Sequence, residues 1–195
     1  MRAAFWPMDG KKDYEPFERG EILYQIENTE RTDVLPPGVY HLALSGPGGT
    51  GGCWYAASGV WAYTSGGSGA TWEGSFYLEE ESTVQVIAAG PQPADSSEHF
   101  SKLIIDDVEM IVCRSGGSTW WGHNNGDGGT FTVNPALQVV ETVKATNGNN
   151  GNGGVQGLPT GAASTSSYGW GAGTNVPEGQ KQTGGALLKY LRPEP

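Results

Sequence analysis

Glycine spacing constrains this chain more than any other feature of its sequence. The 195 residues include 32 glycines, more than twice the usual frequency of roughly 7%. Many of them recur at a three-residue step, in the runs Gly46–Gly52, Gly126–Gly129 and Gly148–Gly157. This step matches the left-handed polyproline II helix, which has three residues per turn and no internal hydrogen bonds. Because such a ribbon is unstable alone, the spacing predicts polyproline II or polyglycine II ribbons packed against one another and joined by backbone contacts.

Close packing of ribbons requires positions without a side chain. In the longest run we predict that these positions are Gly148, Gly151, Gly154 and Gly157. The alternative for any single glycine cluster is a flexible, solvated loop. The two alternatives predict opposite effects of an alanine substitution, since alanine is tolerated in a loose loop and excluded from a packed edge.

The segments between the glycine runs favour β-structure. After Pro37, short runs of β-branched and aromatic residues alternate with glycine clusters, which is typical of an all-β sandwich or roll rather than of βαβ units. No segment carries a convincing helical stripe. The expected strands are Glu21–Glu27, Val39–Leu44, Thr71–Leu78, Thr83–Ala88, Leu103–Ile105, Val108–Cys113, Thr130–Val133 and Leu137–Val143. The predicted core residues are Trp72, Phe76, Leu78, Val84, Val86 and Leu103.

Two regions are predicted from the change in composition near Pro37. Residues 1–36 are charged and poor in glycine, and we interpret them as an N-terminal arm for attachment or oligomer contact. Residues 37–195 form the glycine-rich β domain in this interpretation.

Charge and hydropathy exclude several classes of partner. The net charge of −10 and the pI near 4.6 argue against nucleic acid, which an acidic protein repels. Charges interrupt the first twelve residues before any apolar stretch of signal-peptide length, and no run is long enough to span a membrane. We therefore expect synthesis in a cytoplasm and no membrane insertion. Cys53 and Cys113 are expected to be buried thiols, with a disulfide between them as the alternative.

Catalytic signatures are missing or misplaced. Gly46–Gly51 fits the pattern G-x-G-x-x-G, but the sequence after it does not form the helix that a dinucleotide site needs. The histidines His41, His99 and His123 are not at ligand spacing from one another or from a cysteine. We therefore expect no catalytic residues, no cofactor and no metal.

One acidic cluster needs its own interpretation. Asp106, Asp107 and Glu109 have the chemistry of a paired-carboxylate or Ca²⁺ site. Their place between two strand-like runs favours a polar turn instead. An enzyme that acts on a surface glycan through these aspartates or Asp127 is a minor alternative.

The segment Ser118–Gly128 is the best candidate for recognition. It combines paired indoles with paired amides, which suit stacking on a sugar and hydrogen bonding to its hydroxyls. The alternative is that both indoles pack in the core and that the polar residues form a turn. The predicted receptor-binding residues are Trp120, Trp121, His123, Asn124, Asn125 and Asp127, with Tyr168 and Trp170 as a second group.

The order of several motifs resembles the glycine-rich domain of tailed-phage virion proteins, which include tail fibres and receptor-binding adhesins. The motifs are Pro37–Tyr40, Gly46–Gly52, Gly66–Leu78, Thr83–Gly90, Ser96–Ile104, Asn147–Gly157 and Gly184–Leu191. Together they cover most of the chain from Pro36 to Leu191, although the glycine runs are shorter and tryptophan is more frequent than in the richest members. The last motif is similar to the closing strand of that domain.

The resemblance implies a non-enzymatic structural protein of the virion, made in the host cytoplasm. It implies a homotrimer or another symmetric homo-oligomer, attachment to other virion proteins through the arm, and contact with a host-surface glycan. The alternatives are a head or collar fibre or decoration protein, and a bacterial surface adhesin or filament subunit. An ice-binding protein built from polyproline II ribbons is a more distant alternative.

Overall fold

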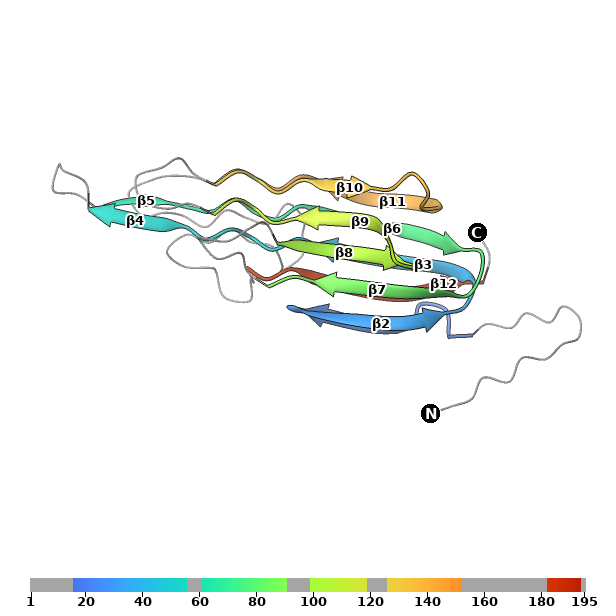
Figure 1. Ribbon diagram of the computed structural model, residues 1–195. Helices are drawn as coiled ribbons and strands as arrows, with labels where there is room; N and C mark the ends of the chain where they lie inside the picture. Colours follow the sequence, from blue (N-terminus) through green and yellow to red (C-terminus); the bar gives the residue numbers. More distant parts are fainter. Residues whose placement is uncertain (1–15, 56–60, 91–98, 119–125, 152–181, 194–195) are drawn as a thin grey trace, which may run out of the picture.

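The fold is an antiparallel β-sandwich extended at one end by glycine-rich backbone (Figure 1). The computed structural model describes residues 16–55, 61–90, 99–118, 126–151 and 182–193, and these residues contain strands and no helix. The first sheet has the order β1-β12-β3-β6-β11, the second has the order β10-β9-β8-β7-β2, and β4 pairs with β5 in a separate hairpin. The predicted all-β class is confirmed.

The strands of the first sheet are β1 (Ile22–Glu27), β12 (Gly185–Arg192), β3 (Gly38–Ser45), β6 (Thr71–Leu78) and β11 (Val139–Thr146). Those of the second sheet are β10 (Phe131–Val133), β9 (Val108–Arg114), β8 (Phe100–Ile105), β7 (Ser82–Ala88) and β2 (Thr29–Leu35). The hairpin consists of β4 (Gly52–Tyr55) and β5 (Trp61–Thr64).

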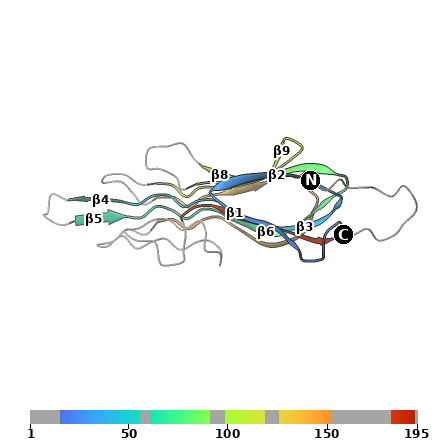
Figure 2. The same ribbon diagram turned by 90° about the horizontal axis from the view of Figure 1, so that it is seen from below.

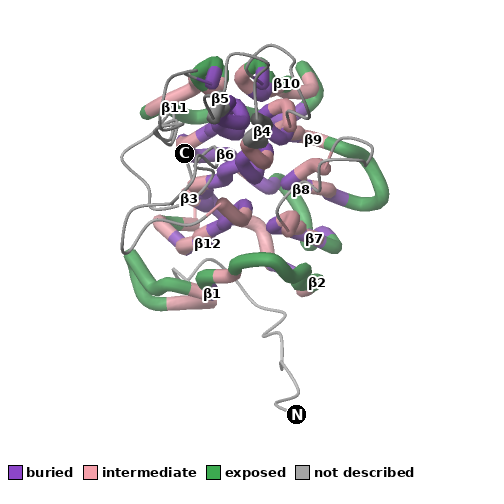
Figure 3. The backbone as a smooth tube through the Cα atoms, turned by 90° about the vertical axis from the view of Figure 1, so that its left-hand side faces the viewer, coloured by how far each residue is buried: buried purple, intermediate pink, exposed green. Residues whose placement is uncertain are grey.

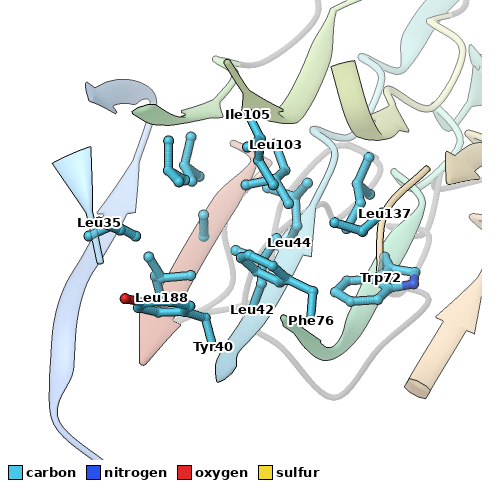
Figure 4. Close-up of a cluster of buried hydrophobic side chains, with 14 of the residues drawn as sticks. Leu35, Tyr40, Leu42, Leu44, Trp72, Phe76, Leu103, Ile105, Leu137 and Leu188 are labelled. Carbon is cyan, nitrogen blue, oxygen red and sulfur yellow. The ribbon is translucent and has the colours of Figure 1, made fainter. Parts of the chain in front are cut away.

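The core lies between the two sheets, where apolar side chains from facing strands meet (Figure 4). Tyr40, at the start of β3, packs against Phe76 with ring centroids 5.9 Å apart and against Tyr190 at 5.6 Å. Period-two alternation produces this face, because every second residue of β3 and β6 points inward. All six predicted core residues are buried: Trp72, Phe76, Leu78, Val84, Val86 and Leu103.

Two strands lie inside the region predicted to be an arm. β1 pairs with β12, and β2 pairs with β7 over seven consecutive residues. The boundary predicted at residue 36 therefore differs from the structure, in which residues 22–35 belong to both sheets. The first of these strands contributes Tyr24 to the core and the second contributes Leu35, and this burial ties the segment to the sandwich. Residues 1–15 lie outside the described residues.

The acidic cluster forms the predicted turn. Asp106 and Asp107 link β8 to β9 with φ angles of 48° and 65°, the positive values that a tight two-residue hairpin needs at both positions. The Oδ1 of Asp106 accepts a hydrogen bond from the Thr83 N–H at 2.8 Å. The carboxylate therefore ties the turn to the neighbouring strand β7.

The molecule has two distinct poles (Figure 2). At one pole the two ends of the described chain meet, since the rings of Phe17 and Tyr190 have centroids 5.5 Å apart. β3 runs away from this pole, from Gly38 to Ser45, and the glycine-rich backbone begins at the next residue. The β4–β5 hairpin lies at the opposite pole (Figures 1 and 2).

Candidate functional site

Five backbone segments lie side by side between the sandwich and the β4–β5 hairpin, and we call them the glycine lattice (Figure 1). They are residues 46–51, 65–70, 115–118, 126–129 and 147–151. None of them forms a strand in the structure. Each connects a strand either to another strand or to a loop. The lattice thus continues the sandwich with backbone of a different kind.

Hydrogen bonds join these segments at a three-residue step. In the segment 65–70, the Gly67 carbonyl accepts from the Gly49 N–H at 2.9 Å, and three residues later the Ala70 carbonyl accepts from the Gly46 N–H at 2.8 Å. On another side, the Gly126 and Gly129 N–H groups donate to carbonyls of the same segment, again three residues apart. The segment 65–70 is bonded to all four of the others and forms the centre of the lattice.

The glycines of the lattice leave no room for a side chain. A Cβ atom on Gly148 would lie 1.8 Å from the Ser68 carbonyl oxygen, and one on Gly151 would lie 2.0 Å from the Ser65 carbonyl oxygen. These separations are far below van der Waals contact, so the backbones approach as closely as they do only because no Cβ intervenes. A side chain at either position would therefore collide with the backbone of the segment 65–70. Gly154 and Gly157 lie outside the described residues, and the polyproline II conformation itself stays a prediction.

The central segment 65–70 was not among the runs predicted to form packed ribbons. Its glycines Gly66 and Gly69 have the same three-residue spacing as the runs that were recognised. Cβ atoms on them would lie 2.1 Å and 2.0 Å from carbonyl oxygens of the segment 46–51. The spacing therefore carried the same signal here as in the recognised run Gly126–Gly129.

Serine and asparagine side chains complete the backbone bonding. The fully buried Ser68 accepts a hydrogen bond at its Oγ from the Asn149 N–H at 2.7 Å. The Oδ1 of Asn150 accepts from the Gly128 N–H at 2.8 Å. N–H groups that the three-residue step leaves without a carbonyl are satisfied in this way.

The bonds also establish the directions of the segments. The segment 46–51 runs antiparallel to 65–70, and 147–151 runs antiparallel to 126–129. The chain therefore leaves the sandwich through 46–51, 115–118 and 147–151, and it returns through 65–70 and 126–129. Consequently the residues at which it leaves and re-enters the lattice, Ser118 and Gly126 among them, are at the pole away from the chain ends.

Most of the predicted receptor-binding residues lie outside the described residues. Asp127 is described: it is exposed, and its carbonyl accepts a hydrogen bond from the Gly117 N–H at 2.7 Å. It thus connects the predicted recognition segment to the lattice. The residues outside the described ranges are Trp120, Trp121, His123, Asn124, Asn125, Tyr168 and Trp170.

The reactive side chains outside the lattice include a buried cysteine and a histidine beside a glutamate. Cys113 is a free, buried thiol whose Sγ lies 3.6 Å from the Leu44 carbonyl oxygen, and burial raises its pKa to about 12. The Cys53 side chain lies outside what the structure describes. His41 Nε2 lies 3.4 Å from Glu73 Oε1 on the first sheet. Within the described ranges, no three His, Cys, Asp or Glu side chains are grouped to hold a metal ion.

Comparison with known proteins identifies no relative. No protein-family model matches the chain, and no curated protein or solved structure matches it either. Among the described residues there is no helix of the length and hydropathy that crossing a membrane requires.

Proposed function

We propose that this chain is a structural component of a phage virion, namely a tail-fibre, tail-tip or other appendage protein that takes part in binding a host-surface glycan. The observation that carries the proposal is the polarity of the molecule. The ends of the described chain meet at one pole, and the lattice segments reverse at the other. An appendage protein needs this division, with attachment at one end and a presented surface at the other.

The lattice suits the presentation of binding residues. It holds the backbone on both sides of the predicted recognition segment, through the Thr50 N–H bond to Ser118 Oγ at 3.0 Å and the Gly126 N–H bond to the Ser65 carbonyl at 3.1 Å. A binding segment whose ends are fixed loses less conformational entropy when it binds. The lattice therefore acts as the scaffold in this proposal.

The chemistry of the predicted residues suits a glycan. With a net charge of −10, the chain gains no long-range attraction to an anionic or neutral cell-surface polymer. Affinity must come from indole stacking on sugar faces and amide hydrogen bonds to hydroxyls, repeated over the copies of an oligomer. Trp121 and Asn125 supply both kinds of contact within five residues.

Adsorption to host cells tests the proposal. We expect the double variant Trp121→Ala/Asn125→Ala to keep its melting temperature and oligomeric state while it loses adsorption. Glu80→Gln is the matched control, because Glu80 is exposed in the turn after β6, at the pole of the chain ends, and it should adsorb as the unmodified chain does.

Three results would each contradict part of this proposal. A folded double variant with unchanged adsorption removes the segment from the binding site. Absence of the chain from purified virions, with display on a bacterial surface instead, favours the adhesin or filament alternative. Detection in the head or collar rather than the tail favours a decoration protein.

A further inference from the structure

The two lateral sides of the sandwich differ in chemistry. β10 and β11 form the edges of the sheets on one side, and β1 and β2 form the edges on the other (Figure 3). Of the six large apolar side chains that are exposed within the described ranges, three are on β11: Val139, Val140 and Val143, with exposed fractions of 40%, 38% and 57%. The β10–β11 side thus carries three of these side chains on one strand, against one each on β1 (Ile22) and β2 (Val34).

Bulges leave two of these valines without a partner on the neighbouring strand. In the pairing of β11 with β6, Glu141 lies opposite Ser75 and Lys144 lies opposite Glu73, but Val140 and Val143 have no partner. An extra residue at each bulge is left out of the ladder. Val140 and Val143 therefore lie on the open edge, three residues apart.

Charge is distributed in the opposite way. No residue between Asp127 and Glu141 is charged, and this stretch contains all of β10 and the start of β11. By contrast, β2 carries Glu30, Arg31 and Asp33 within seven residues. Depletion of charge around exposed apolar side chains distinguishes the centre of a protein interface from ordinary surface.

We propose that the β10–β11 side binds a second copy of this chain through an antiparallel two-fold contact between the two β11 edges. The proposal rests on the oligomeric assembly that forms part of the proposed function, and it names the surface. A two-fold axis between Thr142 and Val143 places Glu141 of each copy beside Lys144 of the other. It also brings Val140 and Val143 of both copies into one apolar strip.

Complementarity favours a second copy over an unrelated partner. Glu141 and Lys144 take part in none of the ion pairs among the described residues, and the two-fold arrangement pairs both of them twice. A chain with a net charge of −10 repels its own copies, and a contact through β10 and β11, which together carry one acidic and one basic residue, minimises this repulsion. A two-fold contact uses the same surface on both copies, so it closes at two copies rather than forming a fibre.

Sedimentation equilibrium of the full chain over a concentration series tests the contact. We expect a species of twice the 20.5 kDa chain mass. The variant Val140→Glu/Val143→Glu should raise the dissociation constant about a hundredfold, because it places four carboxylates in the apolar strip. Val34→Glu is the matched control, since Val34 is 62% exposed on β2, and it should leave the constant unchanged.

Charge reversal tests the two-fold geometry. Glu141→Lys and Lys144→Glu should each raise the dissociation constant about tenfold, because each opposes like charges at both ends of the contact. The double variant Glu141→Lys/Lys144→Glu should restore the dissociation constant of the unmodified chain. All variants should keep the melting temperature of the unmodified chain, which separates loss of assembly from loss of fold.

Three results would overturn the proposal: a monomer at every concentration, an assembly weakened by Val34→Glu but not by the β11 variants, or single charge reversals that the double variant does not rescue. None of these measurements depends on a host receptor. Unchanged adsorption of the Trp121→Ala/Asn125→Ala variant would contradict the glycan proposal and leave this inference standing, and failure of the β11 contact would leave the glycan proposal standing.

Discussion

Replacement of Gly67 by alanine is the sharpest test of the glycine lattice. Gly67 lies in the central segment, donates to the Gly117 carbonyl at 3.0 Å and accepts from the Gly49 N–H at 2.9 Å. A Cβ atom at this position would lie 1.9 Å from the Asp127 carbonyl oxygen. Real Cβ contacts are essentially never shorter than 3.0 Å, so the backbones must separate by at least about 1.1 Å, which breaks bonds of this length.

The magnitude follows from the bonds that are lost. Two or three buried backbone groups without partners cost about 1 to 3 kcal/mol each, or about 2 to 9 kcal/mol in total. A domain has about 5 to 15 kcal/mol of stability, so Gly67→Ala should remove a large part of it. Equilibrium unfolding in urea, followed by tryptophan fluorescence, measures the change.

Gly117→Ala is the matched control in the same lattice. The nearest atom to a Cβ on Gly117 is the Asp127 nitrogen at 3.0 Å, which a shift of a few tenths of an ångström relieves. We expect a loss well below that of Gly67→Ala. If Gly67→Ala and Gly117→Ala both left the free energy of unfolding within about 0.5 kcal/mol of the unmodified chain, close packing would be refuted and solvated loops favoured.

Three further predictions concern the core, the last lattice segment and the buried thiol. Phe76→Ala should cost about 3 to 5 kcal/mol in the unfolding free energy, because Phe76 is fully buried; an unchanged melting temperature would contradict its place in the core. Gly151→Ala should destabilise the chain, whereas Asn147→Ala, at an exposed position, should be nearly neutral by the same urea assay. Burial raises the Cys113 pKa to about 12 from about 8.5 in an unfolded chain, so the unfolded chain loses its proton first and stability should fall as pH rises from about 8.5 to about 12. In a Cys53→Ser background, alkylation at pH 9 should require unfolding, and rapid labelling of the folded chain would disagree with this burial.

The strands that sequence predicted well are those with a clear alternation. β6 was predicted with its exact bounds because Trp72, Phe76 and Leu78 alternate with polar residues. β2 was missed because three of its seven residues are charged and five are exposed, with only Leu35 buried. Pairing with β7 stabilises this edge strand, and a single sequence carries no direct signal of such pairing.

The sequence indicated that glycine segments pack closely, but not which segments become neighbours. The spacing of Gly148 and Gly151 predicted close packing, which depends on the local step alone. The identity of the carbonyl that each glycine contacts depends on which segments become neighbours, and residues such as Ser68 and Gly148 are 80 positions apart. Asn150 illustrates the limit, because its side chain accepts a hydrogen bond from the Gly128 N–H, a contact that the local spacing does not indicate.

The three-residue step of the lattice has a consequence for how related sequences can diverge. Insertion of one residue within 65–70 would move every later carbonyl out of line with its donors and bring a side chain to a position that only glycine occupies. Insertion between Ser118 and Gly126 changes no bond of the lattice. Homologues should therefore differ in length mainly at the pole away from the chain ends, and inside the lattice segments only by multiples of three residues. New surfaces can then evolve at that pole without a new fold.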